Sequence, residues 1–415
     1  MVDVTSPALV DARPTRLITG PFVSVMATAL VFFVYIGMVI VTVPSFVERD
    51  LGAGEFGVGL TMASFAFAAI FARPFLGRLT ERYGRRSLMM AGAAMAAVAT
   101  LGMAVSTALW QVMVLRAVTG LGEAALFVAA ATLIADLSPP SRRAEAASYF
   151  SVAVFGGMGV GPLIGEALAG SDDNYARAFV GAAIMSALAA VTVIGVPRRV
   201  DRSSGRAAEG QPLFERKALA PGIVLACGIA SFAVFMAFAP EYSKSVGLAG
   251  AGGLFLVYSL VSVVLRVVAA KLPERLGAHR TVSIALVALV GGLTLIGLVP
   301  EPWALWVGAA VIGLGMAFLY PSLMANVVNR VSDNERASAL SSLTLFFEVG
   351  TIVGGVVLGG VGELASKQAG FLGGALMALV GIAVLWQFVA PTPAFADERT
   401  ASPDRSFDRV ACDPA

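Results

Sequence analysis

The stretch RPFLGRLTERYGRR, residues 73–86, lies between two long apolar runs, and much of it recurs later in the chain. Its residues return 193 positions further on in matched pairs: Arg73 and Arg266, Leu79 and Leu272, Glu81 and Glu274, Arg82 and Arg275, and Gly84 and Gly277. The same offset carries Gly120 onto Gly313, Gly122 onto Gly315, Gly157 onto Gly350 and Gly161 onto Gly354. One offset that holds along the whole chain indicates a duplication.

The composition is that of a protein that crosses a membrane. Apolar residues make up 58% of the chain and charged residues 13%, against roughly 45–50% and 25% in soluble domains. Runs long enough to cross a bilayer, about 20 residues each, fall near 22–47, 56–76, 87–106, 108–136, 145–169, 177–196, 218–241, 250–270, 281–299, 303–329, 337–364 and 370–390. We therefore predict an all-α membrane protein with 12 transmembrane helices, arranged as two six-helix pseudo-repeats.

The distribution of positive charge predicts the orientation. Of the 29 Lys and Arg residues, 22 lie in the termini and in the loops on the same side, four in the opposite loops and three within spans. Because cytoplasmic loops carry the excess of positive charge, we expect both termini to be cytoplasmic in a multi-pass protein of the cell (inner or plasma) membrane. The expected parts are a cytoplasmic N-terminal segment over 1–21, a six-helix half over 22–196, a cytoplasmic linker over 197–217, a second six-helix half over 218–390 and a disordered cytoplasmic tail over 391–415.

Several classes of protein are disfavoured by the same composition. The basic residues are used for topology, so we expect no nucleic-acid surface. Cys227 lies in an apolar span and Cys412 in the tail, which predicts no disulfide. The single histidine, His279, is expected to be a solvated loop residue beside Arg280. We expect no metal site and no cofactor.

Charged residues inside an apolar span give the strongest functional signal. Arg116, Gly120, Glu123 and Phe127 are spaced 4, 3 and 4 apart and so share one face of a helix. An arginine or glutamate in hydrocarbon is costly unless it is paired or faces water. The stripe is therefore predicted to line an interior cavity, and the alternative is a structural salt bridge between helices.

The run near 145–169 carries a strip of small residues. Gly157, Gly161 and Gly165 lie on this strip, with Pro162 and Glu166 beside it. Such spacing lets another helix approach closely and by itself indicates packing more often than function. Glu166 adds a charge directly after the strip, either for a functional role or as a solvated group near the external end of the span.

These features resemble the major facilitator superfamily over nearly the whole chain. The loop Gly77-x-Leu79-x-Glu81-Arg82-x-Gly84-Arg85-Arg86 is similar to a family motif that holds a cytoplasmic gate, with Glu81 where the family has Asp. The resemblance implies that Glu81 caps the N-terminus of the helix near 337 and bonds Arg85, and that Arg85 also pairs with Asp136. The implied gate residues are Gly77, Glu81, Arg82, Gly84, Arg85 and Asp136.

Two further motifs resemble the 12-helix drug/metabolite:proton antiporters within that family. Leu115-Arg116 followed by Gly120 and Gly122 is similar to a motif whose arginine is associated with proton coupling. Gly157-x-x-x-Gly161-Pro162-x-x-Gly165 is similar to a motif of exporters that exchange substrate for protons. The last glycine of that motif is Glu166 here, which removes a small packing residue and adds a charge.

The predicted function is a proton-coupled secondary active exporter (antiporter) of small amphiphilic drugs or metabolites, acting by alternating access. Glu123 is the first candidate for proton carrier, because burial disfavours its charged form while Arg116, two turns away, favours it. Glu348 and then Glu166 are the next candidates. The expected cavity lining is Tyr35, Phe127, Phe235, Tyr258 and Phe347 beside the acidic groups, which would suit neutral or cationic amphiphiles. Each aromatic taken alone more often serves packing.

Other functions remain open at this stage. A proton-coupled importer or facilitator of a sugar or organic anion would share the fold. An enzyme is not expected, because the sequence offers no nucleophile with a base, no metal-ligand cluster and no phosphate loop. A receptor or scaffold would not need charges inside its spans. The expected partners are a small-molecule substrate, protons and the lipid bilayer, with the protein acting as a monomer.

Overall fold

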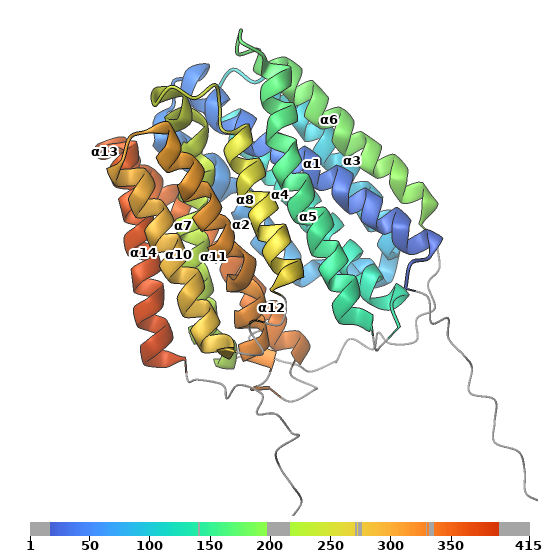
Figure 1. Cartoon of the computed structure of the whole chain (residues 1–415). Coiled ribbons are helices and arrows are strands. Elements are labelled where there is room, and N and C mark those ends of the chain that lie inside the picture. The colour runs from blue at the N-terminus through green and yellow to red at the C-terminus, as the bar shows by residue number, and fades with distance from the viewer. Residues whose placement is uncertain are drawn as a thin grey trace, which may run out of the picture.

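The computed structural model describes residues 17–139, 142–196, 216–269, 276–328 and 336–389, together with Leu272 and residues 330–331, as a bundle of helices (Figure 1). The segments expected over 1–21, 197–217 and 391–415 lie wholly or mostly outside these residues. Within the described part the secondary structure is helical throughout, which confirms the predicted all-α class.

The helices of the first half, α1–α6, coincide with the first six expected spans. Their bounds are α1 Gly20–Arg49, α2 Gly54–Tyr83, α3 Arg85–Met103, α4 Leu109–Leu137, α5 Arg143–Ala169 and α6 Tyr175–Thr192, followed by the short 3-10 turn η2 Val193–Gly195.

The helices of the second half, α7–α14, coincide with the other six spans. A 3-10 turn, η3 Arg216–Ala218, precedes α7 Leu219–Ser245, α8 Gly252–Val268, α10 Ala278–Leu298, α11 Pro302–Val328, α12 Arg336–Ile352, the π-helix η4 Val353–Leu358, α13 Gly359–Leu364 and α14 Lys367–Phe388. The segments α12, η4 and α13 follow one another without a break and occupy one expected span. Among the described residues, eleven spans are long and apolar enough to cross a membrane, and α8 is a shorter apolar helix.

Local signals in the sequence place the ends of several helices. The side chains of Thr19, Asn174 and Ser366 accept hydrogen bonds from the first turns of α1, α6 and α14, as expected of good N-cap residues. Gly84 ends α2 with φ +85° and Gly277 precedes α10 with φ +80°. These left-handed conformations favour glycine, and they explain why glycine stands at both positions.

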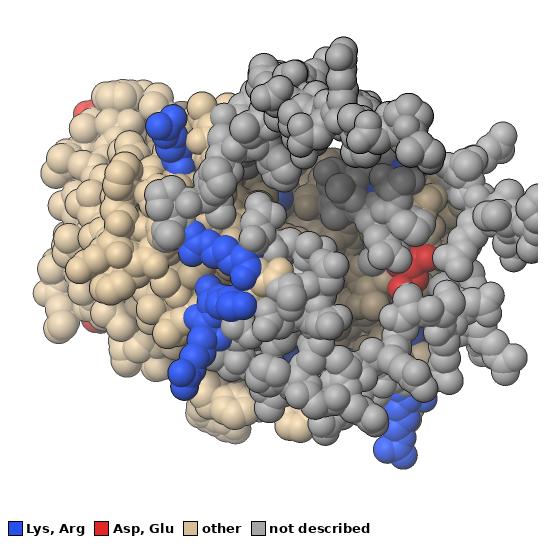
Figure 2. Space-filling view, turned by 90° about the horizontal axis from the view of Figure 1, so that it is seen from below, with Lys and Arg blue, Asp and Glu red and all other residues tan. Residues whose placement is uncertain are grey.

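The two halves meet along several pairs of helices. The first half contacts the second through α5 against α8, α2 against α12, η4 and α13, and α1 against α7. The side of the bundle where α6 ends and α7 begins is called the linker end here, and the opposite side is called the Arg49 end. Figure 2 looks onto the linker end, where blue basic side chains are visible at several places among the residues that are not drawn in grey.

The environment of His279 differs from the expectation. Its side chain is 7% exposed, its Nε2 lies 3.3 Å from the carbonyl oxygen of Leu385, and its ring lies 4.9 Å from that of Trp386. The prediction of a solvated loop residue was therefore wrong. The reason is that α10 begins at Ala278, directly after Gly277, so His279 falls in the first helical turn and packs against α14.

Candidate functional site

An ion pair joins the two halves inside the bundle. Nη2 of Arg73 on α2 donates to Oε1 of Glu348 on α12 at 2.6 Å, and the two side chains are only 15% and 5% exposed. Removing one partner of a buried pair leaves an uncompensated charge and costs about 3–5 kcal/mol. Loss of either charge would therefore leave the other one buried and unpaired between α2 and α12.

Glu123 on α4 belongs to the same group of charges. It interacts electrostatically with both Arg73 and Glu348, and its side chain is partly buried. We call Arg73, Glu123 and Glu348 the central charge cluster. It holds one guanidinium for two carboxylates, so one negative charge stays uncompensated when both acids are ionised.

Arg116 lies on the same helix as Glu123 but in a different environment. Its guanidinium carbon is 4.5 Å from the centre of the Phe65 ring, its side chain is 8% exposed, and it acts electrostatically on Tyr35. The cation that interacts electrostatically with Glu123 is Arg73, a partner not expected from the sequence. Arg116 is stabilised by a cation–π contact, which the prediction of a paired or water-facing arginine did not anticipate.

A third arginine, Arg266 on α8, also lies within the bundle. Its guanidinium carbon is 4.1 Å from the centre of the Phe155 ring on α5, and Nη2 donates to the carbonyl oxygen of Met316 at 3.2 Å. Among the described residues its Nε has no hydrogen-bond partner. Tyr258 and Tyr320 interact with it electrostatically.

The aromatic residues expected to line a cavity divide into two groups. Tyr35 is 0% exposed and accepts a hydrogen bond from Thr100 at 3.2 Å. Phe235 and Tyr258 are 0% and 2% exposed and their rings are 6.4 Å apart, so all three are packed between helices.

The other two aromatics keep contact with the exterior. Phe127 is partly buried, with its ring 6.2 Å from Phe33 and 5.5 Å from Phe150. Phe347 is 38% exposed. Of the five predicted lining residues, these two have surface to offer a ligand in this conformation.

The glycine motif of α5 packs against α1. A Cβ atom on Gly157 would lie 2.7 Å from the backbone nitrogen of Val34, and one on Gly161 would lie 2.7 Å from Cα of Gly37. A Cβ on Gly165 would lie 3.1 Å from the carbonyl oxygen of Met38. The motif therefore allows close helix packing within the first half, with Pro162 set against Gly37.

Four charged residues join the halves at the Arg49 end. Arg49 bonds Asp173 at 2.6 Å and Glu241 at 2.7 Å, and Lys244 lies 3.1 Å from Asp173 and 3.8 Å from Glu241. We call these residues the Arg49 quartet. Burial tends to raise the pKa of Asp173, but the hydrogen bond and charge of Lys244, with the charge of Arg49, hold that pKa below its ordinary value.

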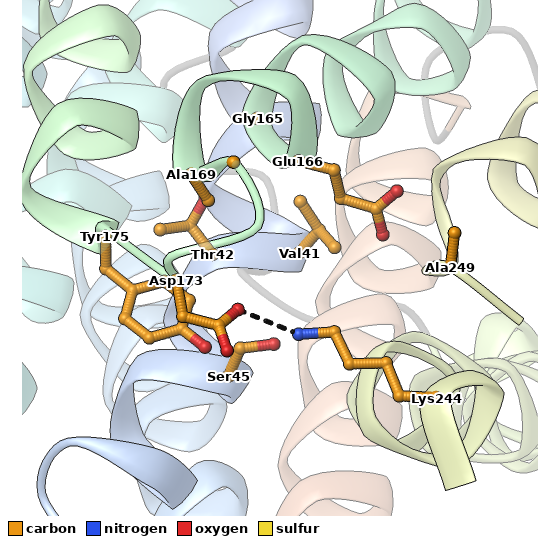
Figure 3. Close-up of a pocket in the computed structure, with 11 residues that line it drawn as sticks. Val41, Thr42, Ser45, Gly165, Glu166, Ala169, Asp173, Tyr175, Lys244 and Ala249 are labelled. Carbon is orange, nitrogen blue, oxygen red and sulfur yellow. Dashed lines mark hydrogen bonds and ion pairs between the residues drawn. The ribbon is translucent and has the colours of Figure 1, made fainter. Parts of the chain in front are cut away.

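Two members of the quartet, Asp173 and Lys244, line a small cavity and face each other there (Figure 3). The cavity has a volume of about 50 Å³, and Val41, Thr42, Ser45 and Glu166 are among the residues that line it. A space of this size can hold a few water molecules. It is too small for the substrates considered above.

Two glutamates reach across the same end to cap a helix of the opposite half. Glu166 on α5 accepts from the backbone nitrogens of Ala251 at 2.6 Å and Gly252 at 2.8 Å, at the start of α8. Glu363 on α13 accepts from Glu55 at 2.7 Å and Phe56 at 3.4 Å, at the start of α2. A carboxylate is favoured there because the first N–H groups of a helix are unpaired and its dipole is positive.

The sequence explains why α2 and α8 are capped by side chains of the opposite half. The N-cap residues of α2 and α8 are Ala53 and Ala251, whose side chains cannot accept a hydrogen bond, and neither helix has a side-chain cap of its own. Nearby, Lys367 bonds Glu48 at 2.6 Å and lies 3.5 Å from Glu55. The Arg49 end is therefore held shut by contacts between the halves.

The predicted gate motif lies at the linker end. Arg85 forms the expected ion pair with Asp136. Gly84 forms the turn between α2 and α3, and Arg82 is exposed with its guanidinium carbon 5.3 Å from the Tyr83 ring. Gly77 and the side chain of Glu81 fall outside the described part, so the implied cap by Glu81 stays a prediction.

The structure brings together charges that the sequence interpretation left apart. Arg73 and Arg266 were paired by the 193-residue offset and counted among the charges of the spans, but no ion pair or ligand was assigned to them, and Glu363 was not singled out. A signal for the first two was available, because they lie in apolar spans and are related by the 193-residue offset. No group of three or more His, Cys, Asp and Glu side chains that could bind a metal occurs in the described residues.

Comparisons with known proteins give a consistent result. A model of the Major Facilitator Superfamily matches residues 25–272 and 222–408. An uncharacterized MFS-type transporter of Pseudomonas aeruginosa strain UCBPP-PA14 is 27% identical over 396 residues, covering 90% of this chain and 96% of that protein. Another from Salmonella typhimurium is 24% identical over 376 residues, covering 87% and 94%.

Solved structures share the fold at low sequence identity. The nucleoside transporter NupG matches with a TM-score of 0.71 and 16% identity, covering 89% of this chain and 100% of that one. A human organic anion transporter, TETRAN, matches with a TM-score of 0.66 and 18% identity, covering 88% and 99%.

Proposed function

The chain belongs to the major facilitator superfamily, and on that premise we propose that it is a proton-coupled exporter of small amphiphilic drugs or metabolites. The observation that carries the proposal is the central charge cluster, in which one guanidinium serves two carboxylates and a bond crosses the interface between the halves. Charged groups at this depth are costly in a membrane protein and mark ion or substrate pathways.

The cluster can couple a proton to a change of conformation. With Glu123 and Glu348 both ionised, Arg73 is attracted to acids on two helices from opposite halves. Binding of one proton removes the uncompensated charge and weakens the hold of Arg73 on whichever acid is neutralised. If substrate and proton each favour a different state of the interface, their binding is linked in opposite directions, as an antiporter requires.

The proposed cycle is alternating access between two six-helix pseudo-repeats. We place the protein in the cell membrane with both termini in the cytoplasm, so that the Arg49 end faces outside. The basic residues visible at the linker end support this orientation (Figure 2). The Arg49 quartet and the two glutamate caps then form the external gate, closed in this conformation. We further propose that the protein acts as a monomer.

Transport in inside-out vesicles tests the proposal. Vesicles with an imposed pH gradient are supplied with a panel of lipophilic compounds, and accumulation is compared between wild type, Glu123→Gln and Glu348→Gln. Glu301→Gln is the matched control, because Glu301 is an exposed loop residue at the Arg49 end. We expect gradient-driven accumulation to be lost in Glu123→Gln and kept in Glu301→Gln. Unchanged accumulation in Glu123→Gln would refute the assignment of the proton carrier.

One alternative has an observation in its favour. Three cations, Arg73, Arg116 and Arg266, lie within the bundle with two anions, Glu123 and Glu348. This excess of positive charge suits an anionic substrate. Proteins of similar fold include a nucleoside transporter and an organic anion transporter. A proton-coupled importer or facilitator of a sugar or organic anion would show uptake that follows an inward substrate gradient, whereas an exporter would not.

A further inference from the structure

Arg266 is a cation inside the bundle for which the described residues supply no carboxylate. Its contacts are the Phe155 ring, the Met316 carbonyl oxygen and electrostatic interactions with two tyrosines. A cation over an aromatic face is attracted to it, but this leaves the charge itself uncancelled. Nε is buried and makes no hydrogen bond within the described part.

The duplicated sequence shows what is missing. Arg266 lies 193 residues after Arg73, and Phe155 lies 193 residues before Glu348. In space, Arg73 of α2 faces Glu348 of α12, and Arg266 of α8 faces Phe155 of α5. The two arginines therefore occupy corresponding positions against corresponding neighbours. One neighbour is a carboxylate, and the other is a phenyl ring.

The surroundings of Arg266 are suited to an acid group on an apolar body. The guanidinium can offer Nε and a second N–H in the planar fork that matches a carboxylate. Tyr320 on α11 interacts electrostatically with both Arg73 and Arg266. The hydroxyl of Tyr258 is buried without a hydrogen-bond partner among the described residues. Phe155 supplies apolar surface beside these donors.

We propose that Arg266 binds the acid group of an amphiphilic organic anion, whose apolar part packs against Phe155. The substrate thus supplies the charge that Glu348 supplies to Arg73. The inference rests on the proposed function only in taking this site to be on the transport route. It replaces the expectation of neutral or cationic amphiphiles, which rested on the acidic groups and did not count Arg73 and Arg266.

Equilibrium binding to the purified full-length protein in uncharged lipid nanodiscs tests the proposal without any gradient. The probes are matched by shape: 1-naphthylacetate, its neutral amide and the corresponding primary amine, with benzoate and octanoate as further carboxylates. Binding is followed as the ligand-induced rise in the unfolding temperature. We expect carboxylate probes to stabilise wild type and the amide and amine to have no such effect.

Variants at both partners make the test specific. Arg266→Gln should weaken carboxylate binding roughly 10- to 100-fold, as expected for losing hydrogen bonds from a charged donor. Phe155→Glu should weaken it to a similar extent while keeping the arginine, because it supplies the carboxylate found at position 348. Phe155→Leu, which stays apolar, is the matched control and should keep carboxylate binding within about fivefold. If Arg266→Gln does not fold, Phe155→Glu decides.

The outcomes separate this inference from the proposed function. Three results would overturn the inference. The first is equal stabilisation by the amide or the amine, and the second is carboxylate binding that survives both Arg266→Gln and Phe155→Glu. The third is no stabilisation by any carboxylate. Each of these results is compatible with intact gradient-driven export. Conversely, Arg266-dependent binding of carboxylates together with transport that ignores the pH gradient would overturn proton coupling and leave the anion site standing.

Discussion

Replacing Glu166 by Gln should open the Arg49 end. The carboxylate accepts from Ala251 and Gly252 at 2.6 and 2.8 Å, and α8 has no side-chain cap of its own. Glutamine keeps the shape and one acceptor oxygen, but it loses the negative charge and leaves one N–H without its partner. Because Glu166 and the start of α8 lie in different halves, the substitution destabilises the closed state. It does not change the free energy of a conformation in which the halves have separated.

The expected size follows from two contributions. A lost N-cap interaction costs about 0.5–2 kcal/mol, and a lost charge at a helix N-terminus costs about 0.3–1 kcal/mol at partly exposed sites. The sum of roughly 1–3 kcal/mol corresponds to a shift of about 5- to 150-fold in the ratio of closed to open molecules. Glu363→Gln should act in the same direction on α2, and the double variant should exceed either single one.

Distances between spin labels measure this shift directly. Labels at Ser171→Cys and Ser245→Cys, two exposed positions on opposite halves at the Arg49 end, report on its opening. Cys412→Ser removes the second native cysteine, and Cys227 is buried. Glu301→Gln serves as the control for loss of an exposed carboxylate. A distance distribution for Glu166→Gln that matches wild type would show that the cap does not hold the gate.

Two further predictions follow from the same structure. Because the pKa of Asp173 is held below its ordinary value of about 3.9, its stabilisation of the closed state should be fully present above pH 3.9 and should be lost only as pH falls through the lowered pKa. Asp173→Asn should widen the distance between the same two spin labels at pH 7 and remove this acid response. An acid response that persists in Asp173→Asn would contradict the assignment. In the glycine strip, Gly157→Ala should lower the unfolding temperature, because its Cβ would lie about 2.7 Å from backbone atoms of α1, at a cost of about 1–3 kcal/mol. The control is Gly156→Ala, which should be tolerated because its Cβ would meet only Leu30, at 4.0 Å.

The helices and some of the turns between them could be predicted, because they depend on composition and on the spacing of residues along the chain. The apolar runs predict helices, since the membrane requires each span to satisfy its own backbone hydrogen bonds, and in the described part of the chain eleven of them are long and apolar enough to cross a membrane. Gly84 and Gly277 mark turns because their backbone conformations exclude most other residues. His279 shows the limit of the method, because a shift of a helix start to Ala278 was enough to move it from solvent to a packed interface.

Contacts between the halves were harder to predict than the helices. The Arg73–Glu348 bond joins residues far apart in the sequence, and helical periodicity places each side chain on a face without saying which helix that face meets. Glu166 illustrates the same difficulty. Its position after a small-residue strip suggested an unusual role, but its target at the start of α8 depends on how α5 and α8 cross.

The positions related by the 193-residue offset suggest how packing and charge are divided in this chain. Where the two copies agree, as at Gly157 with Gly350 and Gly161 with Gly354, the glycines let α5 approach α1, and α12 and η4 approach α7. At one pair the copies differ in charge, because Phe155 corresponds to Glu348. A duplicated bundle with identical copies would place equal charges in both halves, and neither half could act as the partner of a bound anion. The asymmetry at these two positions leaves Arg266 free to meet a ligand while Arg73 holds the interface.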